Sequence, residues 1–266
     1  MNIHLSRLLS ACAIGAALIV PWNDSPSSAA RTGTMKQPVS QYQESKDRSY
    51  YEARGEIIWE VPTEQKVIAL TFDDGPNPQT TGEILDLLNQ YGAKATFFVV
   101  GYRAEMYPEI ILREAKEGHE LANHTYSHPY FKKTTPPSVI EAEIKRTDEI
   151  LRKITGDRPA LFRPPGGFYN ESLVSESKKS GYLTVLWSWH QDTNDWKSPG
   201  VKRIVNKVVN NAQNGDIVLF HDHVNGSRQT VEALKEILPI LHERGFRFVT
   251  VSELLTFQHS RSVHNE

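Results

Sequence analysis

The sequence predicts an α/β fold built on a parallel sheet, which is either open or closed into a barrel. From Val67 onwards, short β-rich apolar runs alternate with longer segments that show helical periodicity. This alternation repeats six or seven times, which favours parallel strands joined by helices. No internal repeat interrupts the pattern, and its length of about 200 residues is typical of one α/β domain.

Each element is placed by its own residues. Expected strands, short and rich in aliphatic and aromatic side chains, lie at 67–72, 95–100, 120–122, 160–162, 183–187, 217–220 and 247–250. Expected helices lie at 79–91, 105–117, 137–154, 171–180, 200–213 and 229–244. Because functional groups of parallel sheets gather at the carboxyl ends of strands, we look for a site there.

Residues 1–30 have the order of a secretory signal peptide. Arg7 precedes an apolar run of 13 residues, 8–20, and the sequence Ser28-Ala29-Ala30 fits a small-x-small cleavage site. The run is shorter than the ~20 residues that span a bilayer, and an uncleaved N-terminal anchor is the alternative. Cys12 follows a sequence like a lipobox, but most apolar residues come after it, which argues against lipidation. We expect a protein that is secreted or associated with the cell wall.

The rest of the chain divides into an arm, a domain and a tail. Residues 31–60 are polar and lack clean periodicity, so they are expected to form an arm or linker. Tyr50, Tyr51 and Trp59 could pack the end of this arm against the core. The folded domain is expected at 61–257 and a polar C-terminal tail at 258–266.

The composition excludes several classes of protein. Lys and Arg number 30 and Asp and Glu 32, so the formal net charge of −2 argues against a nucleic-acid partner. Only one stretch, near the N-terminus, is continuously apolar, which excludes a polytopic membrane protein. The single cysteine, Cys12, rules out an intramolecular disulfide and a cysteine zinc cluster. A metal site would therefore need His and carboxylate ligands.

Two sets of possible metal ligands follow expected strands. Asp73 and Asp74 follow the first strand, where one carboxylate could bind a cation while the other faces a substrate; an ordinary Asp-Gly-Pro turn is the alternative. His124 and His128 follow the third strand and, four residues apart, could share one ion. In a chain with ten histidines, chance spacing is the alternative. Two His and one Asp would leave positions open for water, as in catalytic metal sites.

Three more polar segments follow strands. Arg163 begins the segment 163–167, whose prolines stiffen the chain and whose glycines allow a ligand to approach the backbone; a rigid turn is the alternative. Asp195 and Trp196 end an acidic loop, which could equally be a loop cap with a packing Trp. His221 ends the sixth strand, where a buried structural His is the ordinary interpretation. Five such segments at five strand ends argue for one shared site.

Together these segments resemble the polysaccharide deacetylases of the NodB-homology group, carbohydrate esterase family 4. The likeness runs from Lys66 to Leu255. Its motifs are Thr-Phe-Asp-Asp-Gly at 71–75, His-Thr-Tyr-Ser-His at 124–128, Arg-Pro-Pro at 163–165, Asp-Thr-Asn-Asp-Trp at 192–196 and Leu-Phe-His at 219–221. The resemblance implies a distorted (β/α) barrel of about seven parallel strands, with 61–257 as the catalytic domain of a metal-dependent N-deacetylase.

The resemblance also implies a role for each motif residue. Asp74, His124 and His128 would hold the metal. Asp73 would be the general base, oriented by Arg163, and His221 the general acid, paired with Asp195. Leu219 and Trp196 would wall the pocket for the acetyl methyl group, and the N–H of Gly166 would help bind the oxyanion. The family often has an aromatic residue at the position of Gly166, so this chain departs from the family there and would lack that side chain as one wall of the sugar groove.

The expected cofactor is one divalent ion, with zinc first and cobalt, nickel or iron as alternatives, because an Asp-His-His set accepts all of them. The expected partner is an extracellular glycan, peptidoglycan or chitin oligomers, with N-acetylglucosamine as the target sugar. Aromatic residues near the motifs, Tyr130 among them, could stack on sugar rings, or could be ordinary loop packing. We expect a monomer that binds neither nucleic acid nor, apart from an uncleaved anchor, membrane.

Two other functions remain in view. The same site could hydrolyse an acetyl ester, for instance on acetylated xylan, because an alkoxide leaves more easily than an amine. A non-catalytic glycan-binding protein could also keep this fold. Loss of Asp73 or His221 would be its sequence signature, and both residues are present.

Overall fold

The computed structural model describes residues 46–258, whose strands form one parallel sheet. The sheet order is β1-β6-β5-β4-β3-β2-β7, and β8 pairs with β2. The strands are β1 (Ile57–Ile58), β2 (Val67–Asp73), β3 (Ala95–Val99), β4 (Glu120–Asn123), β5 (Leu161–Phe162), β6 (Leu183–Val185), β7 (Ile217–His221) and β8 (Arg247–Phe248). The predicted α/β class is confirmed, and each predicted strand is present.

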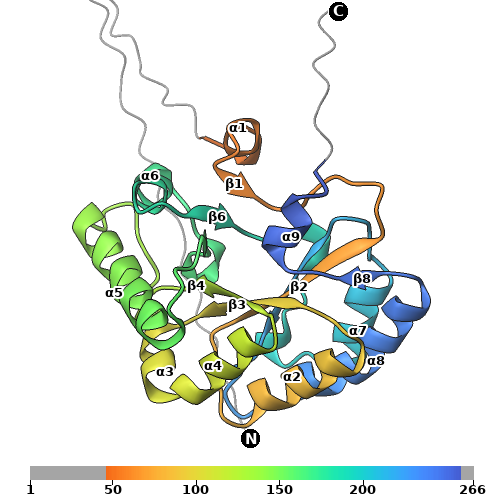
Figure 1. The fold of residues 1–266 in the computed structure, drawn as a ribbon. Helices are drawn as coiled ribbons and strands as arrows, with labels where there is room; N and C mark the ends of the chain where they lie inside the picture. Colours follow the sequence, from red (N-terminus) through yellow and green to blue (C-terminus); the bar gives the residue numbers. More distant parts are fainter. Residues whose placement is uncertain (1–45, 259–266) are drawn as a thin grey trace, which may run out of the picture. The chain divides into compact units, whose positions relative to one another are not determined.

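Most of the helices cover the outer face of the curved sheet, whereas residues 251 and 254 of the last helix pack against its inner side (Figure 1). The helices are α1 (Arg48–Ala53), α2 (Thr80–Gln90), α3 (Gly101–Met106), α4 (Pro108–Lys116), α5 (Pro137–Thr155), α6 (Glu171–Lys179), α7 (Val201–Val209), α8 (Gln229–Glu243) and α9 (Val251–Leu255). The long helix α5 has the helical periodicity of apolar residues by which it was predicted. Ile140, Ile144 and Leu151 are buried on one face, and Gly156 ends the helix in the left-handed conformation with φ 86°.

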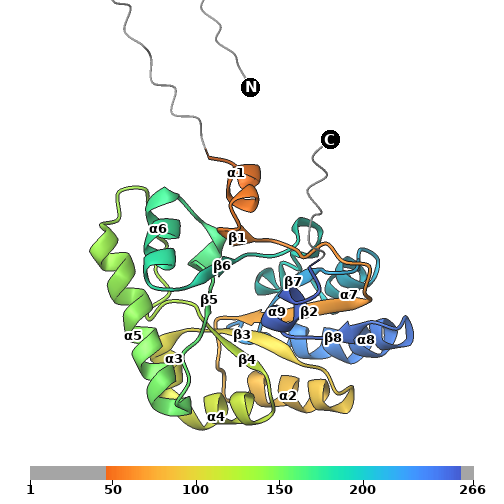
Figure 2. The ribbon, with the colours of Figure 1, turned by 45° about the horizontal axis from the view of Figure 1, so that its top comes forward.

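The segment after β6 crosses to β7 and turns the curled sheet into a distorted barrel (Figure 2). The N–H of Ser188 donates to the carbonyl of Ile217 at 3.0 Å, and Asp192 forms a parallel bridge with Leu219. The barrel architecture implied by the family resemblance is therefore confirmed.

Strand alternation sorts side chains between the inside of the barrel and the helices outside. Val67 and Ala69 of β2 join the inner apolar cluster, whereas Leu70 and Phe72 join the outer cluster with α2 and α8. Because successive residues of a strand point to opposite faces, Asp73 at the end of β2 faces inward. The same alternation that buries the apolar side chains therefore also turns the polar residues at the strand ends toward one site.

One predicted helix was wrong in its extent. The segment 105–117 contains parts of two helices, α3 and α4, that meet at Tyr107. Tyr107 precedes Pro108 and has φ −133° and ψ 55°, outside the helical region. The ring of a proline disfavours helical conformation in the residue before it, so the chain breaks there and Pro108 begins α4.

The folded domain begins before residue 61, within the segment 31–60 that was expected to be an arm. Residues 48–53 form α1, and Ile57–Ile58 form β1, which pairs with β6. Tyr51 and Trp59 are buried, as expected for residues that anchor this segment to the core. The expected signal segment 1–30, the first part of the arm and the tail from 259 lie outside the described residues. Between residues 46 and 258, no helix is long and apolar enough to cross a bilayer.

Candidate active site

The five predicted segments meet at the carboxyl end of the barrel. Asp73 and His221 are the last residues of the paired strands β2 and β7 and stand opposite each other in register. His124 follows β4, Arg163 follows β5, and Asp195 lies in the segment after β6. Residues that are distant in sequence therefore form one cluster, because parallel strands end at the same edge.

Asp74, His124 and His128 form a site that fits a divalent cation. One ligand atom from each lies within 4.8 Å of the others. Asp74 Oδ1 lies 3.0 Å from His128 Nε2 and 3.4 Å from His124 Nε2. Neither contact has hydrogen-bond geometry, so this buried oxygen has no hydrogen-bond partner among residues 46–258. One carboxylate oxygen and two imidazole nitrogens that converge in this way are ligands suited to a divalent cation.

The protein fixes the tautomer and charge that ligation needs. His124 Nδ1 lies 2.7 Å from the carbonyl of Arg163, to which it can only donate, so Nε2 keeps its lone pair for a metal. Burial alone would raise the pKa of Asp74, but His124 and His128 hold it well below its ordinary value. Asp74 is therefore ionised at neutral pH.

Two of these three candidate ligands occupy strained backbone conformations. Asp74 has φ 75° and His128 φ 58°, and Thr125 between the histidines has φ 67°. Left-handed backbone costs a residue with a side chain roughly 1–2 kcal/mol, so the surrounding structure must hold it in place. Asn123 accepts a hydrogen bond from the N–H of Thr125 at 2.9 Å. Such strain at a ligand set is typical of a functional site.

Glu143 of α5 holds the loop that carries the two histidines. Its Oε2 accepts from the backbone N–H of Tyr126 at 2.9 Å and of Ser127 at 2.8 Å, and its Oε1 accepts from the Ser127 hydroxyl at 2.8 Å. No sequence pattern pointed to this role, because Glu143 lies in an ordinary amphipathic helix. Its three hydrogen bonds place it behind the metal site as a positioning residue.

Arg163 and Asp73 form a buried ion pair. The guanidinium is completely buried and stacks on Phe98, with 3.9 Å between its carbon and the ring centroid. Nη1 donates to Asp73 Oδ1 at 2.7 Å and to the Thr71 hydroxyl at 2.9 Å. Nε and Nη2 donate to the carbonyls of residues 185 and 186. Asp73 Oδ2 is left facing the metal site, 3.7 Å from His124 Nε2.

His221 and Asp195 form a second charged pair on the opposite side. His221 Nδ1 lies 2.7 Å from Asp195 Oδ1, and Asp195 also accepts from the Thr230 hydroxyl at 2.7 Å and the backbone N–H of Trp196 at 2.9 Å. Burial alone would lower the pKa of His221, but Asp195, with Asp73 and Asp74, raises it to about 9. His221 is therefore a protonated imidazole at neutral pH.

Tyr130 occupies the space that a side chain at Gly166 would fill. Gly166 has φ 66°, and a Cβ there would lie 2.6 Å from Tyr130 Cε1. The Tyr130 ring packs edge-on against His128, 5.6 Å between centroids, and against Phe168. Tyr130 and Phe168 are each 62% exposed. Two exposed aromatic rings from neighbouring positions therefore lie where a side chain at residue 166 would stand.

The two residues expected to line the acetyl pocket differ in exposure. Leu219 of β7 is buried and lies on the same face of the strand as His221. The Trp196 ring is 53% exposed, with the Lys197 ammonium 4.6 Å from its centroid. Leu219 thus lies inside the barrel beneath His221, whereas Trp196 lies at the surface.

Two buried carboxyl groups behind the site were not predicted. Asp222 follows His221, its side chain accepts from the Thr81 hydroxyl at 2.6 Å, and its N–H donates to the carbonyl of Asp73. Burial raises the pKa of Asp222 to about 7. Burial and the nearby Asp222 also raise the pKa of Glu114 well above its ordinary value. The Asp222 carboxyl group also explains Gly75, because a Cβ at that position would overlap it.

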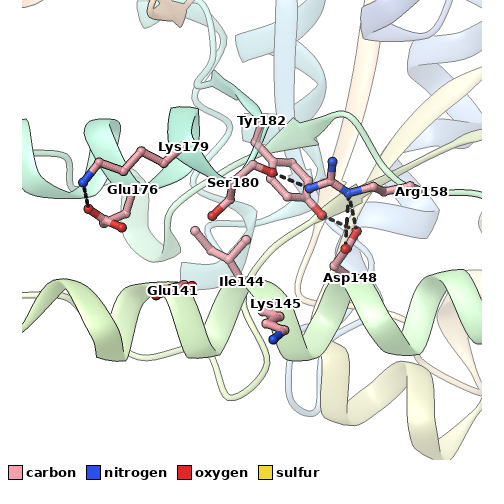
Figure 3. Close-up of a pocket in the computed structure, with 9 residues that line it drawn as sticks. All are labelled: Glu141, Ile144, Lys145, Asp148, Arg158, Glu176, Lys179, Ser180 and Tyr182. Carbon is pink, nitrogen blue, oxygen red and sulfur yellow. Dashed lines mark hydrogen bonds and ion pairs between the residues drawn. The ribbon is translucent and has the colours of Figure 1, made fainter.

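A separate cavity of about 390 Å³ lies between α5 and α6 (Figure 3). Four of its six charged side chains are paired with one another: Asp148 accepts from Arg158, and also from the Tyr182 hydroxyl, and Lys179 pairs with Glu176. None of the motif residues lines it. We therefore assign the chemistry to the strand ends and not to this cavity.

The chain is similar to known proteins over most of its described part. The family profile described as polysaccharide deacetylase matches residues 60–185. A peptidoglycan-N-acetylglucosamine deacetylase of Bacillus cereus is 50% identical over 212 residues, which are 80% of this chain and 99% of the relative.

Solved structures share both the fold and part of the sequence. The Bc1960 peptidoglycan N-acetylglucosamine deacetylase has a TM-score of 0.71 and 36% identity, over 79% of this chain and 98% of that one. A family 4 acetyl xylan esterase from Clostridium thermocellum, solved with a cobalt ion, has a TM-score of 0.67 and 36% identity, over 72% and 91% of the two chains.

Proposed function

Because this chain belongs to the polysaccharide deacetylase family, carbohydrate esterase family 4, we propose that it removes N-acetyl groups from N-acetylglucosamine residues of peptidoglycan. Chitin oligomers offer the same acetamido group and are the alternative substrate. The observation that carries the proposal is the arrangement of three cation ligands between a buried carboxylate, Asp73, and a protonated imidazole, His221.

Asp74, His124 and His128 would hold one divalent cation, for which zinc is our first candidate and cobalt, nickel and iron the alternatives. A bound cation of this kind polarises an amide carbonyl and lowers the pKa of a water molecule. The cobalt ion in the structure of the acetyl xylan esterase supports a metal in this family. The oriented His124 tautomer and the ionised Asp74 support the same ligand set in this chain.

Asp73 is proposed as the general base. Arg163 occupies its Oδ1, so Oδ2 is the oxygen free to take a proton from the attacking water. The buried guanidinium also keeps Asp73 from turning toward another partner. The N–H of Gly166, whose left-handed backbone lies beside Tyr130, is proposed to stabilise the oxyanion that forms.

His221 is proposed as the general acid. An amine leaves a tetrahedral carbon readily only after it has been protonated, and His221 holds that proton at neutral pH because its pKa is raised to about 9. Asp195 holds Nδ1 and therefore aims Nε2 away from itself, toward the site. Asp195 is thus a positioning residue that also keeps His221 charged.

We propose that the enzyme acts outside the cytoplasm, since its proposed polymer lies in the cell wall and residues 1–30 have the pattern of a signal peptide. N-terminal sequencing of protein recovered from the culture medium or cell wall tests this. A mature chain that begins near residue 31 is expected, and intact protein confined to the cytoplasm would contradict the proposal.

Mass spectrometry tests the reaction and the substrate together. The enzyme is incubated with purified peptidoglycan and with chitin oligomers, each with and without a chelator. Loss of acetyl groups that stops with chelator and returns with added zinc is the expected result. No loss on either N-acetylated glycan would overturn the proposal.

Acetyl ester hydrolysis is a second candidate function, favoured by the similarity to the acetyl xylan esterase. Acetylated xylan in a parallel reaction distinguishes the two. Faster release of acetate from xylan than from either N-acetylated glycan would make the esterase the better assignment.

A further inference from the structure

A cluster of polar side chains lies beside the metal ligands on three neighbouring loops. Asn77 lies three residues after Asp74, His223 lies two residues after His221, and Arg103 belongs to α3, which follows β3. The strands β3, β2 and β7 that carry these loops are adjacent in the sheet. Asn77, Arg103 and His223 are each partly exposed, so a ligand can reach them.

The contacts within this cluster bring together more hydrogen-bond donors than acceptors. His223 Nδ1 lies 2.7 Å from Asn77 Nδ2, and His223 Nε2 lies 2.5 Å from Arg103 Nη2. The Asn77 amide cannot be turned around, because its Oδ1 already accepts from the N–H groups of residues 79 and 80. A neutral imidazole accepts at only one nitrogen, so one of the two contacts brings two donors together.

Protonation of His223 would add a further donor to the cluster, because both ring nitrogens would then carry a hydrogen. The surroundings of His223 disfavour this protonation. Burial and the Arg103 charge lower the pKa of His223. With His223 neutral, the tautomer that accepts from Asn77 presents its Nε2–H to the Arg103 guanidinium. The cluster then has a surplus of donors and lacks an acceptor.

Arg103 also lacks an anionic partner. Within residues 46–258, no carboxylate lies within 4.0 Å of its guanidinium nitrogens, and the carbonyl of Pro76 is a weak acceptor at 3.4 Å. By contrast, Arg113 pairs with Asp86 and Glu117. A half-buried guanidinium next to surplus N–H groups is a receptor for an oxyanion, since each donor could then face an acceptor.

We infer that Asn77, Arg103 and His223 form a subsite for a carboxylate carried by the glycan next to the sugar that is deacetylated. Arg103 would bind one or both carboxylate oxygens, and the Nε2–H of His223 would donate to the same group, while Nδ1 accepts from Asn77. The inference rests on the proposed function and sharpens its substrate. Peptidoglycan carries carboxylates on its peptides and, where a peptide has been removed, on the lactyl group of its muramic acid, whereas chitin oligomers carry none.

Binding to three soluble glycans tests the subsite without requiring turnover. The probes are chitotetraose, a peptide-free tetrasaccharide of alternating N-acetylglucosamine and N-acetylmuramic acid, and the same tetrasaccharide with its peptides attached. Arg103→Gln removes the charge, and Arg103→Lys keeps the charge without the planar fork. Arg152→Gln, at an exposed arginine of α5, is the matched control. Unfolding midpoints confirm that each variant is folded.

Arg103→Gln is expected to weaken binding of an acidic glycan about tenfold and to leave chitotetraose unchanged, because only the charged ligand uses the guanidinium. Arg103→Lys should fall between wild type and Arg103→Gln, and Arg152→Gln should match wild type. A selective loss on the peptide-free glycan identifies the muramic carboxylate, and a loss confined to the peptide-bearing glycan identifies a peptide carboxylate.

Equal weakening on all three glycans, or no weakening on any, would overturn the subsite. The outcome is separable from that of the proposed function. If wild type binds acidic glycans through Arg103 yet deacetylates none, the subsite stands and the proposed activity fails. If wild type deacetylates glycans and Arg103→Gln treats acidic and neutral ones alike, the activity stands and the subsite fails.

Discussion

Arg163 donates to Asp73 at 2.7 Å inside the barrel, with the guanidinium side chain completely buried and the carboxylate side chain 5% exposed. The pair joins the third motif to the first across a separation of 90 residues in sequence. Because one oxygen of Asp73 is held by Arg163, the other is left to face the cation ligands. The geometry of the proposed base is therefore set by a side chain that is itself completely buried.

Loss of Arg163 should destabilise the protein as well as impair catalysis. Arg163→Ala leaves the buried Asp73 charge unpaired, so the free energy of unfolding should fall by about 3–5 kcal/mol. Arg163→Lys keeps the charge but cannot reach the acceptors held by Nε, Nη1 and Nη2, so it should recover only part of the stability. Urea unfolding measures both. A stability of Arg163→Ala within about 1 kcal/mol of wild type would contradict the buried pair, on the scale expected for it.

Glu143 should control metal affinity without touching the metal. Glu143→Ala removes the three acceptor contacts that hold the His124–His128 loop, so zinc affinity should fall about 10–100-fold, the usual effect of removing a group that orients ligands. Titration with a competing chelator measures this. Glu141→Ala, an exposed acidic residue on the same helix, is the control. Identical affinities of the two variants would show that Glu143 does not position the loop.

Asp195 should set the alkaline limit of activity. The pKa of His221 is raised to about 9, so the acid form is present below that pH and is lost above it. A bound cation offsets the contribution of Asp74, so the fall in kcat/KM should come at or below about 9. Asp195→Asn removes the neighbouring charge and should move this fall to lower pH. If kcat/KM of the Asp195→Asn variant fell at the same alkaline pH as that of wild type, the fall would not report the titration of His221.

Glu114 should make the protein less stable as pH rises. Burial and Asp222 raise the pKa of Glu114 in the folded state, so above the ordinary pKa of about 4.3 the folded protein holds a proton that the unfolded chain has released. Stability then falls by about 1.4 kcal/mol per pH unit until the folded-state pKa is reached.

The amide of Glu114→Gln cannot titrate, so thermal unfolding of this variant should depend less on pH than that of wild type above about 4.3. Glu109→Gln, at an exposed position of the same helix, is the control and should follow wild type. Parallel curves for wild type and Glu114→Gln would show that Glu114 is ionised in the folded protein.

The sequence was most informative where one strand end carried one motif. The β-rich apolar runs of β2 and β7 predicted both strands and placed Asp73 and His221 at their carboxyl ends. The structure adds that both residues lie on the strand face that buries Val67 and Ile217. The break at Pro108 was readable in principle, but the helical periodicity on both sides concealed it. The two-residue strand β1 is too short to show any period, so its place in the sheet could not be predicted.

The residues that support the site could not be predicted from any pattern in the sequence. Glu143 and Glu114 lie in helices whose acidic residues look like solvated positions, and only tertiary packing brings Glu143 to the histidine loop and Glu114 near Asp222. The relation of Gly166 to Tyr130 was equally hidden, because the ring that fills the space belongs to another loop. Pairings between distant segments depend on the finished fold, and one sequence does not report them.

The Asp73→Asn variant tests the central claim most directly. The amide oxygen of the substituted side chain can still accept from Arg163, which also keeps its acceptors at residues 71, 185 and 186. The variant should therefore lose stability, because the Arg163 charge is left without its anion, but keep the fold and the three candidate metal ligands while the general base is lost. We predict zinc content equal to wild type and a deacetylation rate on N-acetylglucosamine oligomers lower by about 10²–10⁴-fold, the usual contribution of a general base. Retention of near wild-type kcat, or loss of the metal together with activity, would contradict the assignment of Asp73 as the base.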